Sequence, residues 1–188
     1  MRRPVQILIV VVAVLAGFGL AGCSQSPSNA AIVNGTTVTE EAVSSAANGF
    51  IDIVTTLNSE SGQPPPSQAN ARGTVISWLI DGVLADQLSV VTGQTISDAD
   101  VEQLANQYID APLFLKDPGS CQAMAGELRW TILRTKVSQG QLDQAVFTDF
   151  AERADINLNP RYGRWSSDSL SLQAPGLGLN APILSGMI

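Results

Sequence analysis

The sequence predicts a mainly α domain of about five helices, with a small β-ribbon joining its N-terminal and C-terminal ends. Two observations carry this prediction. Between residues 40 and 154, apolar residues recur at three- and four-residue spacing, which places them on one face of an α-helix. Short runs with strand character lie near the two ends of that region, at 31–38 and 156–159.

The ribbon begins with the segment AIVNGTTV at 31–38. Asn34-Gly35 favours a type I′ hairpin turn, which needs a positive φ at both central residues. An isolated two-stranded ribbon is only marginally stable in water. We therefore expect the alternating segment Ile156-Asn157-Leu158-Asn159 to pair with Ile32-Val33 and tie the two ends of the domain together.

The first two helices are predicted at 40–58 and at about 68–91. Thr39 is a suitable N-cap for the first helix, and Pro64-Pro65-Pro66 follows its end. The second helix has a broad apolar face, and Gly93 is placed as its C-terminal stop.

Three shorter helices are predicted in the second half of the domain. Ser97-Asp98-Ala99-Asp100 resembles a capping arrangement that opens the third helix. The fourth helix is expected from Pro118 or Ser120 to about Ser138, and the fifth from about Leu142 to Ala154.

The N-terminus carries an export signal. Arg2 and Arg3 precede the apolar run Ile7 to Leu20, and Leu20-Ala21-Gly22-Cys23 resembles the lipobox of a bacterial lipoprotein. The resemblance implies a diacylglyceryl thioether on Cys23, cleavage before it, and an acylated or free new N-terminus. A transmembrane helix is the competing interpretation. It needs about 20 apolar residues, and this run is shorter and has no basic flank after it.

These signals divide the chain into a signal peptide at 1–22, a lipidated flexible tether at 23–30, a domain at 31–165 and a loosely ordered Gly/Pro/Ser tail at 166–188. Cleavage removes two basic residues and leaves eight against 17 acidic ones, a net charge of −9. Without a Lys or Arg cluster, nucleic acid is not an expected partner. The membrane is expected as a partner only through the N-terminal lipid.

The residue types present argue against an enzyme. The chain has no histidine, which excludes Ser-His-Asp and Cys-His sites and His-liganded zinc. Asp98, Asp100 and Glu102 lack the further ligands of a calcium loop and are better explained as helix-capping acids. We therefore predict no catalytic residue, metal or cofactor. Cys121 has no partner once Cys23 is lipidated. It is either a reactive thiol or, as we favour, a small buried residue.

Three segments in order resemble the SurA/PrsA type of extracytoplasmic chaperone. They are the strand–"VNG"–strand–helix opening at 31–41, the Ile-Ser-Asp helix entry at 95–101, and the closing strand followed by "NPRYG" and Trp165 at 154–165. The resemblance covers about 31–165. It implies a helical domain with a small sheet that binds non-native polypeptides during export.

The chain departs from that family in one respect. SurA and PrsA carry a parvulin prolyl isomerase domain before the closing strand, whereas only Lys136 to Asp155 is available here. We therefore expect a holdase without isomerase activity. The alternative is a non-catalytic lipoprotein that docks onto one folded partner of the cell envelope.

Trp78, Trp130 and Trp165 are the candidate polypeptide-binding residues, since aromatic side chains are enriched in recognition surfaces. For Trp78 and Trp130 a role as core anchors is the competing interpretation. Arg161 and Tyr162 are expected to clamp the closing strand onto the helices. The sequence indicates no oligomeric state.

Overall fold

The structure is a computed structural model that describes residues 28–59, 62–167 and 170–173. The predicted signal peptide, Cys23 and the last part of the predicted tail, 174–188, lie outside the described residues.

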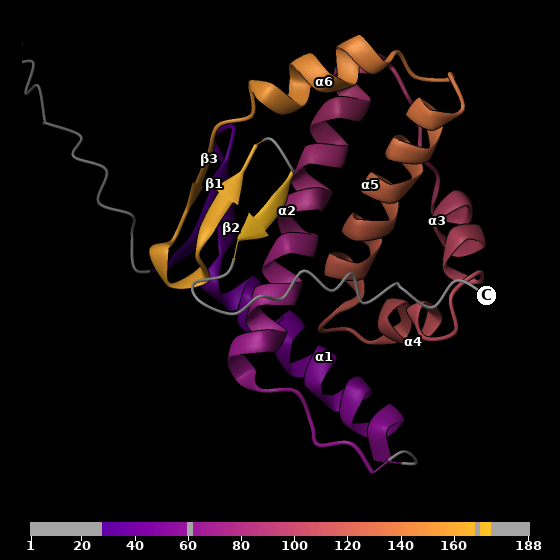
Figure 1. The fold of residues 1–188 in the computed structure, drawn as a ribbon. Helices are drawn as coiled ribbons and strands as arrows, with labels where there is room; N and C mark the ends of the chain where they lie inside the picture. The colour runs from indigo at the N-terminus through magenta and orange to yellow at the C-terminus, as the bar shows by residue number, and fades with distance from the viewer. Residues whose placement is uncertain (1–27, 60–61, 168–169, 174–188) are drawn as a thin grey trace, which may run out of the picture.

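The described chain is mainly helical with small antiparallel sheets, which confirms the predicted fold class (Figure 1). It has six helices where about five were expected. They are α1 (Glu40–Ser59), α2 (Gln68–Thr92), α3 (Asp98–Ala105), α4 (Ala111–Lys116), α5 (Cys121–Ser138) and α6 (Gln144–Glu152).

The ribbon joins the two ends of the domain as predicted. Strands β1 (Asn29–Val33), β2 (Thr36–Thr39) and β3 (Ile156–Leu158) form an antiparallel sheet in the order β2-β1-β3. Ile32 lies opposite Asn157. Between β1 and β2, Asn34 and Gly35 have φ angles of 47° and 83°, so both adopt the positive φ that their sequence predicts.

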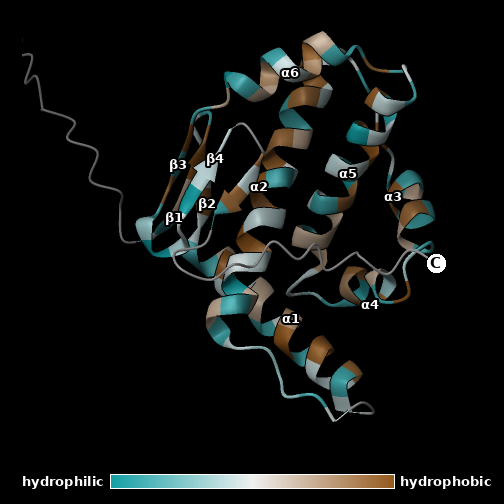
Figure 2. Cartoon of the chain, viewed as in Figure 1, coloured by the Kyte–Doolittle hydropathy of each residue, from teal (hydrophilic) through white to brown (hydrophobic). Residues whose placement is uncertain are grey.

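Helix α2 is the centre of the core and lies between the sheet and α5 (Figure 1). Hydrophobic residues occur along most of its length (Figure 2). It is long and apolar enough to cross a membrane by length and composition alone, but half of its most apolar window is buried inside the domain. Burial of that kind is typical of the core helix of a folded domain.

Helices α2 and α5 approach each other closely where two glycines meet. A Cβ atom on Gly82 would lie 3.0 Å from the Cα atom of Gly126, and a Cβ atom on Gly126 would lie 2.7 Å from the carbonyl oxygen of Trp78. The missing side chains therefore let the two backbones touch.

The structure differs from the sequence expectations at three places. Helix α4 was not predicted. Strand β1 begins inside the predicted tether, and Ala30 is fully buried. Beyond the expected end of the domain at residue 165, β4 (Arg164–Ser166) pairs with β5 (Ser171–Gln173), so ordered structure extends into the predicted tail.

Candidate functional site

A hollow that the described residues line lies beside β3 and the β4–β5 hairpin. Its volume is about 850 Å³ and it is open to solvent. Its lining comes from β3, from the turn that follows β3, and from the hairpin: Asp155, Ile156, Asn157, Leu158, Pro160, Gly163, Arg164, Trp165 and Gln173.

Strand β3 is an edge strand of its sheet, because β1 is its only paired neighbour in the described chain. Only every second residue of the β3 segment forms backbone hydrogen bonds with β1. The amide of Asn34 donates to the carbonyl of Asp155 at 2.8 Å, and the amide of Asn159 donates to the carbonyl of Ala30 at 2.9 Å. In a strand, successive backbone groups point to opposite sides. Residues 155, 157 and 159 therefore face β1, and the N–H and C=O groups of Ile156 and Leu158 face the outer edge.

Trp165 is the predicted candidate that lines this hollow. It lies on β4 opposite Leu172 of β5 and is half-buried. Its indole N–H is buried and has no acceptor among the described residues. A buried donor without an acceptor lowers the stability of the fold, and it is the partly exposed ring, not the N–H, that Trp165 presents to the hollow.

The turn between β3 and β4 sets how far the β4–β5 hairpin lies from β3 across the hollow. It is a 3₁₀ turn, Pro160–Tyr162, followed by Gly163 with φ of 112°. Only glycine adopts such a φ without strain, and here it turns the chain into β4. The hollow therefore depends on how firmly this turn is held.

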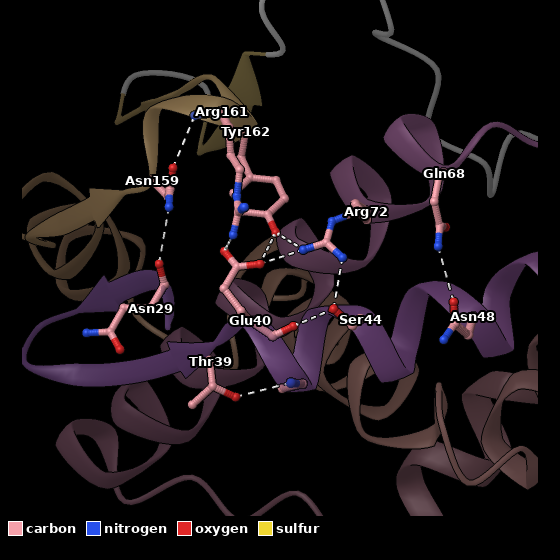
Figure 3. A network of polar contacts seen from close by, with 11 residues as sticks. Asn29, Thr39, Glu40, Ser44, Asn48, Gln68, Arg72, Asn159, Arg161 and Tyr162 are labelled. Carbon is pink, nitrogen blue, oxygen red and sulfur yellow. Dashed lines mark hydrogen bonds and ion pairs between the residues drawn. The ribbon is translucent and has the colours of Figure 1, made fainter. Parts of the chain in front are cut away.

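A polar cluster holds the turn to the helices, which agrees with the clamp expected of Arg161 and Tyr162 (Figure 3). Both side chains reach Glu40, the first residue of α1. Arg161 forms an ion pair with Oε1 of Glu40, and the Tyr162 hydroxyl donates to Oε2 at 2.8 Å. From α2, Arg72 donates to the Tyr162 hydroxyl at 2.6 Å and pairs with Oε2 of Glu40.

The electrostatics of the cluster favour an ionised Glu40. Burial by itself would raise the pKa of Glu40, but the hydrogen bonds from Arg161 and Tyr162 and the charges of Arg161 and Arg72 outweigh burial and lower it. Burial also raises the pKa of Tyr162, and its bond to Glu40 adds to that rise. The hydroxyl thus remains a donor to the carboxylate.

The other two candidate tryptophans lie in the core, as their alternative interpretation proposed. Trp78 is 7% exposed and packs against Phe50 and Phe114 with ring centroids 5.6 and 5.7 Å away. Trp130 is 2% exposed and stacks on Phe147 at 5.2 Å. Neither side chain lines the hollow. The structure brings only Trp165 to it.

Of the three carboxylates expected to cap α3, Asp100 does so, whereas Asp98 pairs with Arg129 of α5 at 3.3 Å. Ser97 and Asp100 form a capping box in which the Asp100 side chain accepts from the Ser97 amide at 2.8 Å. Within the described residues, no group of three acidic or cysteine side chains is placed to hold a metal ion. Cys121 is half-buried, not fully buried as we favoured, and Cys23 lies outside the described residues.

A buried acid escaped the sequence analysis. Asp81 of α2 is 6% exposed, although it lies in an otherwise apolar run. Burial, the charge of Glu127 on α5 and a hydrogen bond to it raise the pKa of Asp81 well above its ordinary value, and Arg134 only partly opposes them. The signal was a carboxylate at an apolar position of a helix, which indicates a protonated or paired acid.

The chemistry that the hollow offers is non-covalent. It combines a sheet edge, with outward backbone donors and acceptors, and the partly exposed ring of Trp165. Asp155 and Arg164 bring opposite charges to its lining.

Comparison of the chain with family models, with curated proteins and with solved structures found no match.

Proposed function

We propose that this chain is an exported, lipid-anchored protein that binds non-native polypeptides on the outer side of a membrane and delays their aggregation, without enzymatic or prolyl isomerase activity. The anchor is the lipid on Cys23 that the lipobox implies. The observation that carries the binding function is the hollow beside β3, which combines a sheet edge with Trp165.

The chemistry of the hollow suits an unfolded chain better than a small polar metabolite. Unfolded segments expose apolar side chains and unpaired backbone groups together, and the hollow offers partners for both. Backbone hydrogen bonds carry no sequence information, so such a site tolerates clients of unrelated sequence.

A second candidate is a docking lipoprotein that holds one folded partner in the cell envelope. The length of β3, three residues, favours it, because so short an edge suits one defined segment of a partner. The two candidates differ in selectivity. A holdase acts on several unrelated unfolded clients, and a docking protein ignores them.

The test uses the full lipidated chain in liposomes and a thermally unfolding client whose light scattering is followed without ATP. Several unrelated clients should aggregate more slowly than with empty liposomes. Trp165→Ala should lose most of this effect, and Trp165→Phe should retain more of it. Ile109→Ala removes an apolar side chain that is 86% exposed and does not line the hollow, so it serves as the control.

Two results would refute the proposal. If wild-type proteoliposomes leave the aggregation of every client unchanged, the docking lipoprotein is favoured. If the protein accelerates prolyl isomerisation in a proline-containing test peptide, the absence of isomerase activity is wrong.

A further inference from the structure

We propose that the polypeptide binds by strand addition, as a further β-strand paired with the outer edge of β3. This inference rests on the proposed function and deepens it by naming the ligand class. The ligand is an extended segment with unpaired backbone groups, and at least one apolar side chain of that segment contacts Trp165.

The register of β3 is the first argument. Ile156 lies opposite Val33 and Leu158 opposite Ala31, the positions at which β3 does not bond to β1. Their N–H and C=O groups point outward, and no strand of the described chain pairs with them. Two residues with one donor and one acceptor each provide up to four main-chain hydrogen bonds to an added strand.

The place of the hollow is the second argument. An added strand runs about 4.8 Å from the edge it joins. The space on that side is the hollow, because its lining contains β3 and, from the hairpin, Arg164, Trp165 and Gln173. An incoming strand would thus form hydrogen bonds with β3 and lie beside Trp165.

The third argument is the indole of Trp165. Its ring is only half-buried and lines the hollow. An apolar side chain of an added strand can therefore pack against the exposed part of the ring while the backbone of that strand bonds to β3.

The sharpest variant is Ile156→Pro. Proline removes the N–H that points outward and places a ring on the edge, while the bonds to β1 come from residues 155, 157 and 159. Ile156→Ala is the matched control, because it removes the same side chain and keeps the N–H. The probe is a fluorescent peptide that alternates valine and threonine between terminal lysines, titrated against the full chain in lipid nanodiscs.

We expect Ile156→Pro to weaken peptide binding about tenfold or more relative to Ile156→Ala, since one edge bond is lost and the ring blocks its neighbours. Equal affinities of the two variants would overturn strand addition. Circular dichroism verifies the fold of each variant. A second measurement keeps the proposal testable if Ile156→Pro does not fold: wild type should not bind the same peptide N-methylated at every residue, and equal binding of both peptides overturns the proposal.

Other occupants of the edge are separate outcomes. If the wild-type chain forms dimers that Ile156→Pro dissolves, the edge pairs with a second copy. If peptide binds only after removal of residues 174–188, the occupant is this chain's own C-terminal segment. Either result overturns the assignment to a client.

The inference and the proposed function fail in different ways. If wild-type proteoliposomes delay aggregation and Ile156→Pro does so equally well, the protein is a holdase that does not use β3. If the peptide binds at β3 but no client is protected, strand addition stands and the holdase is wrong.

Discussion

The hydroxyl of Tyr162 donates a 2.8 Å hydrogen bond to Oε2 of Glu40, a residue 122 positions earlier in the chain. This bond joins the turn after β3 to the first residue of α1. Arg72 donates to the same hydroxyl from α2, so one phenol connects three elements. Because the turn leads into β4, this contact determines where Trp165 lies relative to β3.

The clamp can be tested by removing its hydroxyl. Tyr162→Phe should lower the free energy of unfolding by about 1–2 kcal/mol, because the carboxylate of Glu40 and the guanidinium of Arg72 each lose a partner. Urea denaturation measures the change. Tyr108→Phe is the control, since the Tyr108 hydroxyl makes no hydrogen bond within the described chain. Equal losses in both variants would show that the Tyr162 hydroxyl contributes no more to the free energy of unfolding than the Tyr108 hydroxyl does.

Glu40 should make the protein sensitive to acid. Its pKa is lowered in the folded state, so its contribution is present above the ordinary value near 4.5 and is lost as the pH falls through the lower folded value. Glu40→Gln should therefore cost about 2–3 kcal/mol at neutral pH and much less in acid. Chemical denaturation across this pH window measures the difference. A cost that is independent of pH would contradict the ionised clamp.

Asp81 should give the opposite dependence of stability on pH. Its folded pKa lies above the ordinary value of 3.8, so its stabilising contribution is complete below 3.8 and is lost as the pH rises through the folded value. Asp81→Asn stays neutral and can donate to Glu127, so it should be more stable than wild type by about 1–2 kcal/mol once the pH exceeds the folded pKa of Asp81. The advantage should vanish in acid. Asp86→Asn, whose side chain is 67% exposed in wild type, should show neither effect.

The glycine contact between α2 and α5 predicts opposite effects of one type of substitution. Gly126→Ala should destabilise by about 1–3 kcal/mol, because the new methyl group meets the backbone of α2. Gly73 lies in α2, and a Cβ atom added there would have no atom within 4 Å, so Gly73→Ala should stabilise by about 0.5–1 kcal/mol. Thermal melting distinguishes the two. A gain in both variants would mean that α2 and α5 separate without cost.

The proposed lipidation depends on the sulfur atom of Cys23. Cys23→Ser should leave the uncleaved precursor without acyl chains, since the lipobox implies a thioether at that thiol. Mass spectrometry and detergent partitioning of the purified protein measure the outcome. A wild-type protein that retains residues 1–22 and carries no acyl mass would show that the lipobox is not used.

Local signals predicted the secondary structure well where they were strong. The Asn34-Gly35 turn, the Ser97 cap and the Gly93 stop are each decided by a few neighbouring residues, because turns and caps depend on local φ preferences and local hydrogen bonds. Helix α4 was missed because its local signal is weak. Its six residues are too few for a hydrophobic period to show.

Distant contacts were predicted less evenly. The pairing of β3 with β1 followed from the instability of a lone ribbon, and the register confirms it. The β4–β5 hairpin was missed, because its three-residue strands lie in a segment rich in serine and because it packs on α2, which is distant in sequence. As a result, the hollow that the hairpin borders was not predicted either.

The sequence by itself determined the order and type of the main helices, the turn at Asn34-Gly35 and the acidic balance of the chain, since these depend on neighbouring residues or on composition alone. Tertiary structure alone decided which of three tryptophans lines a hollow, that the pKa of Asp81 is raised, and which backbone groups of β3 face outward. Those properties depend on burial and on the partners of each group, and burial is set by elements that are far apart in the chain.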